Sequence, residues 1–235
     1  MTEDIEEHNF KIVLVGETGV GKTSIISQFI DQIFEEDLQT STGGSFSSKE
    51  LIFDNGKSLK LEIWDTAGQE RYRALTKIFY KNASCAILVY DITNKQTFEE
   101  LKTYWINQIK ESAPKNIILA IVANKEDLLE KEEVDEKEAR NFAKENEALF
   151  FSTSAKNSLG INQLFMDIGK KYTGWSGTVK IAANKEEVDN EDKNNKKNEE
   201  YNYNEGTNED NIRQRKITVK LKNENKEGDK KKGCC

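Results

Sequence analysis

Apolar runs and polar stretches alternate along residues 10–175 and predict strands and helices in turn. Three runs rich in β-branched and other apolar residues predict strands at residues 10–16, 85–91 and 116–125. Helix-like spacing of apolar residues lies between and after these runs, at residues 22–33, 95–111, 135–147 and 161–172. The alternation is typical of an α/β fold, in which a mostly parallel sheet carries helices on both faces.

Residues 48–65 predict a β-hairpin, because two strand patterns are joined by Asn55 and Gly56. One more strand lies within residues 148–156, so the predicted sheet has six strands, one of them antiparallel. The polar residues 35–48 before the hairpin predict an exposed loop. Because ligands bind such sheets at the carboxyl ends of the strands, a functional site is expected there.

The alternation stops at residue 176, where the chain becomes rich in Asn, Lys and Glu and poor in large apolar residues. Such a segment buries too little apolar surface to offset the entropy lost on ordering. The predicted organisation is therefore a flexible lead (1–9), one domain (10–175) and a disordered tail (176–235). Residues 212–222 of the tail could form a short amphipathic or strand-like segment, or remain a solvated basic stretch.

The formal net charge of −7 is unevenly distributed. Residues 1–175 carry −8 and residues 176–210 carry −5, whereas residues 211–235 carry +6. An acidic folded part is not typical of a nucleic-acid-binding protein. The basic charge is instead concentrated at the end of the tail.

The few cysteines and the one histidine exclude several kinds of chemistry. Cys85 lies in an apolar strand pattern and is predicted to be a core residue. The chain has no Cys-x-x-Cys pair, and its one histidine, His8, lies in the polar lead. A zinc site and a histidine-dependent catalytic triad are therefore not expected. No signal peptide or bilayer-length apolar run is found, so we expect a cytosolic protein.

A phosphate-binding loop follows the first predicted strand, where GETGVGKT at residues 16–23 matches G-x-x-x-x-G-K-[ST]. Glycines let the backbone wrap around phosphate oxygens, so that successive N–H groups and a helix N-terminus meet the anion. Lys22 would reach the β- and γ-phosphates, and the Thr23 hydroxyl would bind Mg²⁺. This loop alone fits ATPases, kinases and GTPases.

Two further motifs favour guanine as the base. Asn124, Lys125 and Asp127 follow a buried strand with the spacing N-K-x-D. The Asp127 carboxylate can accept from the two donors of guanine, N1–H and the 2-amino group, which adenine lacks. The stem of Lys125 can lie along the base. The sequence STSAK at residues 152–156 would offer backbone N–H groups to the guanine O6 from three residues, Ser154, Ala155 and Lys156.

The chain resembles a Ras-superfamily small GTPase of the Rab family over residues 10–172, on the motifs GETGVGKT, WDTAGQERYR, ANKEDL and STSAK. The resemblance implies a Ras-like P-loop NTPase fold that binds GTP or GDP with Mg²⁺. It also implies nucleotide contacts along the whole phosphate loop, from Gly16, Thr18, Gly19, Val20, Gly21, Lys22, Thr23 and Ser24.

The same resemblance assigns roles around the γ-phosphate. Asp65 would support the Mg²⁺ shell, the Gly68 N–H would bond the γ-phosphate, and Gln69 would orient the attacking water. Gln69 and Lys22 are the expected catalytic residues. Because the chain shows no internal arginine finger, we expect slow intrinsic hydrolysis and an activating protein that supplies the missing charge.

The first switch loop departs from the usual Rab pattern Thr-Ile-Gly, because the chain has TSTGGSF at residues 40–46. Counting from Lys22 places the Mg²⁺-binding hydroxyl at Ser41, which we favour, whereas counting back from Asp65 places it at Thr42. Phe34 either packs edge-on to guanine or closes the first helix as a core residue.

The surface that Rab partners recognise would include aromatic residues near the switches. The candidates are Trp64, Tyr72, Phe79 and Tyr80, some of which must pack in the core instead. The implied partners are an exchange factor, an activating protein, an escort or dissociation-inhibitor protein and effectors, with the chain itself a monomer.

The chain ends in KKKGCC, and in Rab proteins a terminal Cys-Cys pair accepts two geranylgeranyl groups. Cys234 and Cys235 would thus anchor the protein, because two lipid chains beside a basic patch hold firmly to a membrane. The expected place is the cytoplasmic face of an intracellular membrane, with a cytosolic pool and a role in vesicle traffic. The alternatives are a nucleotide-locked scaffold that does not hydrolyse GTP, and a P-loop ATPase or kinase.

Overall fold

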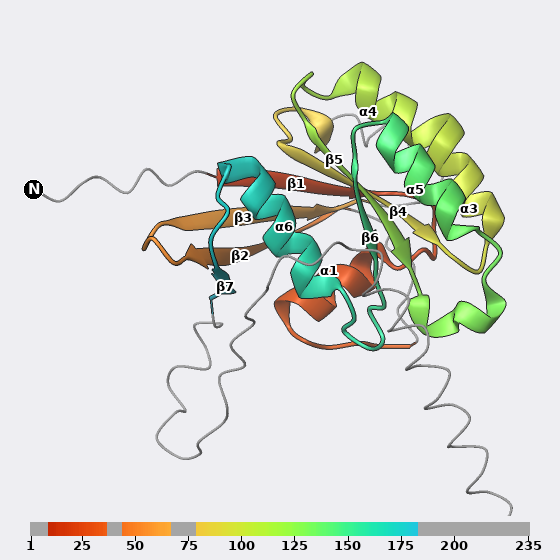
Figure 1. Cartoon of the computed structure of the whole chain (residues 1–235), viewed down its shortest axis with the longest axis horizontal. Helices are drawn as coiled ribbons and strands as arrows, with labels where there is room; N and C mark the ends of the chain where they lie inside the picture. Colours follow the sequence, from red (N-terminus) through yellow and green to blue (C-terminus); the bar gives the residue numbers. More distant parts are fainter. Residues whose placement is uncertain (1–8, 37–43, 67–78, 183–235) are drawn as a thin grey trace, which may run out of the picture. The chain divides into compact units, whose positions relative to one another are not determined.

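The computed structural model describes residues 9–36, 44–66 and 79–182, all within the compact unit Met1–Asn195. Strands and helices alternate along the chain as the apolar pattern predicts, around one central sheet (Figure 1). The strands are β1 (Asn9–Val15), β2 (Ser45–Phe53), β3 (Ser58–Asp65), β4 (Cys85–Asp91), β5 (Ile118–Asn124), β6 (Leu149–Ser152) and β7 (Val179–Ile181). The helices are α1 (Lys22–Ile30), α3 (Lys95–Glu100), the π turn η2 (Leu101–Trp105), α4 (Ile106–Ser112), the 3₁₀ turn η3 (Glu126–Lys131), α5 (Glu136–Glu145) and α6 (Ile161–Thr173).

The sheet has the strand order β6-β5-β4-β1-β3-β2-β7. The five strands from β6 to β3 are mutually parallel, and β2 runs antiparallel to both β3 and β7. The predicted mostly parallel α/β sheet is therefore confirmed, but six strands was wrong, because β7 adds a seventh.

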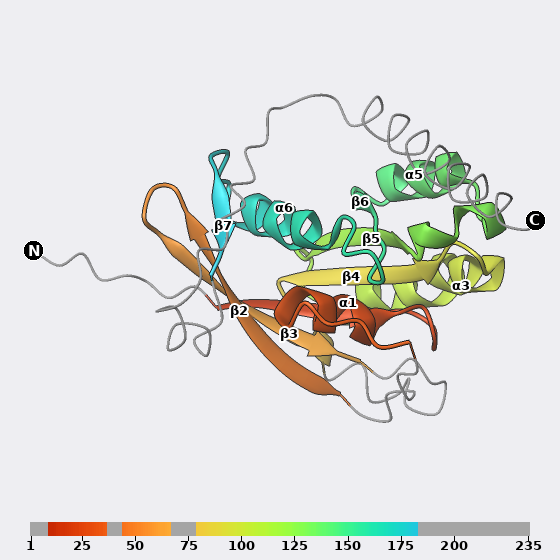
Figure 2. The same cartoon turned by 90° about the horizontal axis from the view of Figure 1, so that it is seen from below.

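β7 forms from residues that the composition placed in the disordered tail. It pairs with the outer edge of β2, where Ile52 faces Lys180, and Figure 2 shows it beside the β2–β3 hairpin. Trp175, at the end of the predicted domain, packs edge-on to Phe53 with ring centroids 6.5 Å apart. The predicted start of the tail at residue 176 was too early. Residues 176–182 lie in the described part of the chain and include β7, which forms through long-range pairing.

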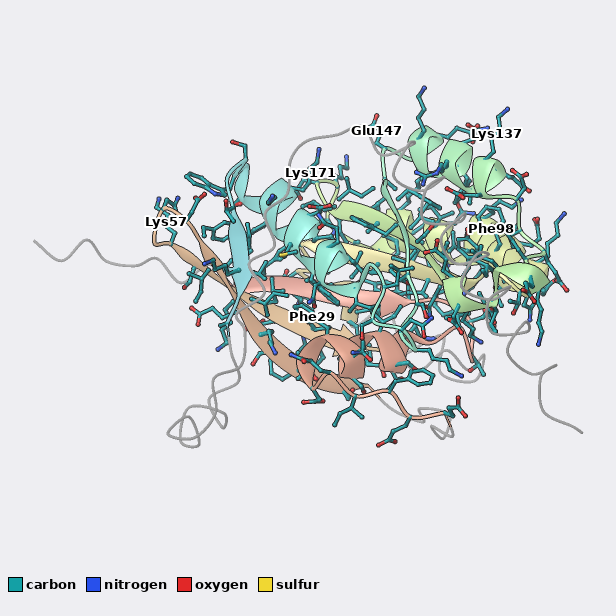
Figure 3. The ribbon with its side chains drawn as sticks, turned by 60° about the horizontal axis from the view of Figure 1, so that its bottom comes forward. Phe29, Lys57, Phe98, Lys137, Glu147 and Lys171 are labelled. Carbon is teal, nitrogen blue, oxygen red and sulfur yellow. The ribbon has the colours of Figure 1, made fainter. Side chains whose placement is uncertain are left out.

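Two apolar cores lie on opposite faces of the sheet. On one face, α1 and α6 pack together, and Phe29 stacks on Phe165 with ring centroids 3.9 Å apart. On the other face, α3, η2, α4 and α5 cover the sheet, and Phe98 is fully buried there. Figure 3 shows Phe29 on the α1 side and Phe98 on the α3 side. Continuous apolar strands such as β4 are explained by burial on both faces.

The hairpin turn is a three-residue loop rather than a two-residue one. The Gly56 N–H donates to Phe53 O (3.0 Å), and Phe53 N–H donates to Lys57 O (2.9 Å). Gly56 has φ +80°, which a type I turn followed by a left-handed residue requires. Among the described residues, no helix is both long and apolar enough to cross a bilayer.

Candidate functional site

The candidate site is a cavity of about 420 Å³ at the carboxyl ends of the parallel strands. Because β1, β4, β5 and β6 run the same way, the loops that follow them meet at one edge of the sheet. Twelve of the predicted site residues line the cavity: Thr18, Gly19, Gly21, Lys22, Thr23, Ser24, Phe34, Asn124, Lys125, Asp127, Ala155 and Lys156.

Four more predicted residues lie just behind the lining, and each is hydrogen-bonded to a residue that lines it. Gly16 bonds to Lys22 and Val20 bonds to Asn124. Asp65 bonds to Thr23, and Ser154 bonds to Asp127. The structure therefore brings together every predicted site residue that it describes.

The remaining predicted residues, Ser41 with its alternative Thr42, Gly68, Gln69, Cys234 and Cys235, lie outside the described residues. The same holds for Tyr72 and the tail segment 212–222.

The phosphate loop runs from β1 into α1 and curves around Lys22. Lys22 is 6% exposed, and its ammonium donates to Gly16 O (2.9 Å) and Glu17 O (2.8 Å). Burial lowers the pKa of Lys22 to about 8, although the nearby charges of Asp65 and Glu17 act in the opposite direction. The loop thus presents a cation at the centre of a curve of backbone N–H groups.

Glycine is required at Gly21 by both backbone and space. Its φ is +94°, and a Cβ placed there would collide with the side-chain amide of Asn124. Because Gly21 has no Cβ, the end of β5 that carries Asn124 can approach the phosphate loop closely.

Thr23 and Asp65 form an oxygen pair beside the loop. Thr23 Oγ1 donates to Asp65 Oδ2 (2.6 Å), and Asp65 is 2% exposed. Hydroxyl and carboxylate oxygens are ligands that Mg²⁺ accepts, and this ion usually completes its shell with water and phosphate oxygens. The pair fits an ion bound between the protein and a phosphate chain.

The base-recognition residues are held by neighbouring loops. Asn124 Nδ2 donates to Val20 O (2.8 Å), and Asn124 Oδ1 accepts from Thr153 Oγ1 (3.1 Å). Asp127 Oδ1 accepts from Ser154 Oγ (2.6 Å). Asn124 therefore ties β5 to the phosphate loop and to the loop after β6, while Ser154 fixes the orientation of the Asp127 carboxylate.

Lys125 adopts a left-handed backbone with φ +69°, which turns the chain at the end of β5. Its ammonium forms an ion pair with Asp91 Oδ2 (2.6 Å), a carboxylate that also accepts from the Thr93 hydroxyl (2.7 Å). The pair anchors the tip of Lys125, so its stem lines the cavity.

Phe34 lies where either of the two roles that the sequence left open is possible. Its side chain lines the cavity and also packs against the core that contains α1 and α6. Beside it, Glu36 forms an ion pair with Lys156 (2.5 Å) at the mouth of the cavity.

Sequence reasoning missed four lining residues, Glu35, Glu36, Thr66 and Leu128. Thr66 is fully buried and its hydroxyl donates to Leu14 O (2.5 Å), so it fixes the chain directly after Asp65. Its place in the motif WDTAG could have identified it. The two glutamates carry no motif, and only the fold places them here.

Comparison with known proteins agrees with this geometry. The sequence model of the Ras family matches residues 11–173. The human Ras-related protein Rab-22A is 43% identical over 161 residues, which cover 68% of this chain and 82% of that protein. The GTP-binding protein ypt5 of Schizosaccharomyces pombe is 43% identical over 164 residues, which cover 69% of this chain and 77% of that protein.

These relatives are GTPases, and they lend no support to the alternative of a scaffold that does not hydrolyse GTP. The phosphate loop and the Asp127–Ser154 pair, lying within the matched region and lining or adjoining one cavity, are what such a protein requires. The chain belongs to the Ras family and, within it, to the Rab GTPases.

Proposed function

We propose that the chain is a Rab switch that alternates between GDP-bound and GTP-bound forms and hydrolyses GTP slowly on its own. The observation that carries this proposal is a single cavity, lined at one end by Lys22 and at the other by Asp127. A nucleotide is the kind of ligand that needs a phosphate cradle and a base-reading carboxylate in one continuous site.

Guanine selection rests on Asp127. Its carboxylate would accept from N1–H and the 2-amino group, while Ser154 holds it in place from behind (2.6 Å). An adenine would leave the carboxylate without donors, which is costly in a partly buried site. The backbone N–H groups of Ala155 and Lys156 would complete the contact at O6.

Hydrolysis rests on positioning and charge. Lys22 would bind the β- and γ-phosphates, since burial and the two loop carbonyls hold its ammonium where those oxygens belong. Thr23, Asp65 and Ser41 would hold Mg²⁺, which supplies charge stabilisation at the transferring phosphate when bound. Gln69 would orient the attacking water, and an activating protein would add an arginine.

We further propose that the protein works in vesicle traffic on the cytoplasmic face of an intracellular membrane. The support is the Rab kinship and the terminal Cys234–Cys235 pair after a basic stretch. Geranylgeranylation of these cysteines would give the two-chain anchor that stable attachment requires. Exchange factors, dissociation inhibitors and effectors would bind through the switch regions.

Single-turnover hydrolysis of bound GTP tests the enzymatic part. We expect a slow wild-type rate that rises when an activating protein is added, and a lower rate for Gln69→Leu. A wild-type rate equal to that of Gln69→Leu under both conditions would contradict the proposal.

Competition between nucleotides tests the base assignment separately. GDP should displace a fluorescent guanine nucleotide, whereas ADP should fail at concentrations roughly 100-fold higher or more. Asp127→Ala should weaken GDP binding and narrow that gap, because the carboxylate is the selecting group. Equal displacement by ADP and GDP in the wild-type protein would refute the role given to Asp127.

A further inference from the structure

A buried tryptophan between α3 and α4 contacts the start of the phosphate loop. Trp105 is fully buried, and its indole Nε1–H donates to Glu17 Oε1 (3.0 Å). Glu17 is the residue directly after Gly16, within the loop that surrounds Lys22. The two residues are 88 positions apart, so only the fold brings them together.

Trp105 lies in a π turn that interrupts the predicted helix of residues 95–111. The Ile106 N–H donates to Leu101 O, five residues back, instead of the usual four. Side chains brace this turn, since Thr103 Oγ1 donates to Glu99 O (2.8 Å) and Asn107 Nδ2 donates to Thr103 O (2.8 Å). Single π turns within α-helices are rare and frequently occur at functional sites.

Two adjacent side chains at the end of the turn face the core. Trp105 is 0% exposed and Ile106 is 3% exposed. The ring of Trp105 packs in the apolar cluster on the α3 face of the sheet, while its one polar atom reaches Glu17 at the edge of that cluster. A buried indole N–H without an acceptor would be costly, so the contact fixes both partners.

The backbone of Glu17 connects the Trp105 contact to the phosphate site. The Glu17 carbonyl accepts from the Lys22 ammonium (2.8 Å), beside the Gly16 carbonyl (2.9 Å). The far end of the same loop is held by Asn124 Nδ2, which donates to Val20 O (2.8 Å). The loop is thus restrained at both ends, by Asn124 near Gly21 and by Trp105 near Gly16.

We propose that Trp105 is a positioning residue for guanine nucleotide binding and hydrolysis, acting through Glu17 to hold the phosphate loop and Lys22 in their binding geometry. Sites that stabilise phosphate charge depend on donors placed before the ligand arrives. The proposal deepens the proposed GTPase function and rests on it.

A double-mutant cycle tests the proposal in the full chain. The variants are Trp105→Phe, which keeps an aromatic ring but removes the N–H, Glu17→Ala, which removes the acceptor, and the double variant. The readouts are the dissociation rate of fluorescent GDP and the single-turnover rate of GTP hydrolysis. Each single variant should release GDP about three- to tenfold faster, as expected for loss of one hydrogen bond. The two effects should be less than multiplicative in the double variant, because both substitutions remove the same contact.

Two controls separate positioning from simple packing. Glu17→Gln keeps an oxygen acceptor for the indole and should change GDP release less than Glu17→Ala does. Phe98→Leu removes packing from the same buried cluster and leaves the Trp105–Glu17 hydrogen bond in place. It should lower the urea midpoint without the accelerated release seen for Trp105→Phe.

Multiplicative effects in the double variant, or equal acceleration by Phe98→Leu, would overturn the proposal. So would unchanged GDP release and hydrolysis in Glu17→Ala, a loop variant whose folding does not depend on a core side chain. A wild-type protein that failed to bind or hydrolyse GTP would instead refute the proposed function itself.

Discussion

At the scale of single residues, neighbouring groups restrict the positions that the key residues of the site can adopt. Lys22 is buried with a lowered pKa of about 8, yet two loop carbonyls receive its ammonium, so the cation stays where phosphate oxygens would bind. Gly21 leaves room for the Asn124 amide. The carbonyls belong to the loop itself, whereas Asn124 lies far along the chain, and together these contacts explain why a loop rich in glycine can have a defined shape.

Gly21→Ala should weaken GDP binding by about 30- to 150-fold, which corresponds to about 2–3 kcal/mol. Left-handed backbone costs a non-glycine residue roughly 1–2 kcal/mol, and displacing the Asn124 amide from Val20 O costs about 1 kcal/mol more. Equilibrium titration with fluorescent GDP measures the change. Gly56→Ala is the matched control, because Gly56 has φ +80° in the hairpin loop and no atom near its missing Cβ. That variant should lose stability but keep its GDP affinity; equal losses of affinity in both variants would contradict the role of the Gly21–Asn124 approach.

Asp167→Asn should stabilise the protein at neutral pH. Burial raises the pKa of Asp167 above its usual range, against the hydrogen bond from Gln163 and the charge of Lys170. The folded state therefore holds the proton more tightly than the unfolded state, so stability is lost as pH rises from about 4 through the raised pKa. At pH 7, urea unfolding should give a higher free energy of unfolding for Asp167→Asn than for the wild type. This difference should vanish towards pH 3. Glu50→Gln is the control, because Glu50 is an exposed carboxylate on β2. An increase in stability of Asp167→Asn that did not depend on pH would contradict burial of the carboxylate as the cause.

At the scale of elements, β7 completes one edge of the sheet. β7 lies beyond residue 173, where the match to the Ras family ends. It covers one end of the β2 edge, and Asp54 closes the junction, since its N–H donates to Thr178 O (3.1 Å) and its Oδ2 accepts from Thr178 N–H (2.6 Å). An exposed strand edge invites pairing with other chains, so β7 also protects that part of β2.

A chain that ends at Gly174 should be less stable than one that ends at Ala182, although both lack the rest of the tail. The shorter chain loses β7 and the half-buried Trp175, for which we expect a decrease of about 2–3 kcal/mol in the free energy of unfolding. Urea unfolding gives the difference, and hydrogen exchange of the Asp54 amide should accelerate in the shorter chain only. GDP affinity should stay the same in both, because β7 lies outside the cavity. Equal stability of the two chains would mean that β7 contributes nothing to the fold.

At the scale of the whole molecule, the proposed function assigns different tasks to the folded domain and the tail. The described domain holds the nucleotide site, and the tail supplies the +6 stretch and the terminal cysteines by sequence. Under the proposed function, the lipid anchor would decide where the switch acts, and the domain would decide when. These tasks can be tested separately, by substitutions in the cavity and by substitutions at the last two residues.

Replacing Cys234 and Cys235 together by serine should move the protein from the membrane fraction to the supernatant. Each single replacement should leave weaker, reversible attachment, since one lipid chain binds a membrane only marginally. Fractionation of cells that express each form measures the change. Cys85→Ala is the control, because Cys85 is fully buried in β4 and its thiol cannot serve as an anchor. Continued membrane attachment of the double serine variant would refute the lipid anchor.

Most of the fold and of the nucleotide site could be predicted because their signals are local. Strand–helix alternation and the predicted helix starts at Lys22 and Ile161 match the structure. The phosphate loop and the N-K-x-D motif each occupy a short stretch, so fixed spacing reveals them. The interruption of the 95–111 helix by a π turn was not predicted, because the packing of Trp105 against distant residues decides it.

The phosphate loop, the N-K-x-D motif and the Ras-like sheet could all be read from the sequence, since contiguous residues and their periodicity encode each of them. Only the tertiary structure decided which aromatic side chains are core and which are surface. Tyr80 is fully buried whereas Phe46 is 51% exposed, and neither fact follows from neighbouring residues. The tertiary structure likewise decided the pairing of β7 with β2, the Glu17–Trp105 contact and the support of Asp127 by Ser154. The physical reason is that these contacts join residues 27 to about 130 positions apart, so their energies depend on the folded chain as a whole.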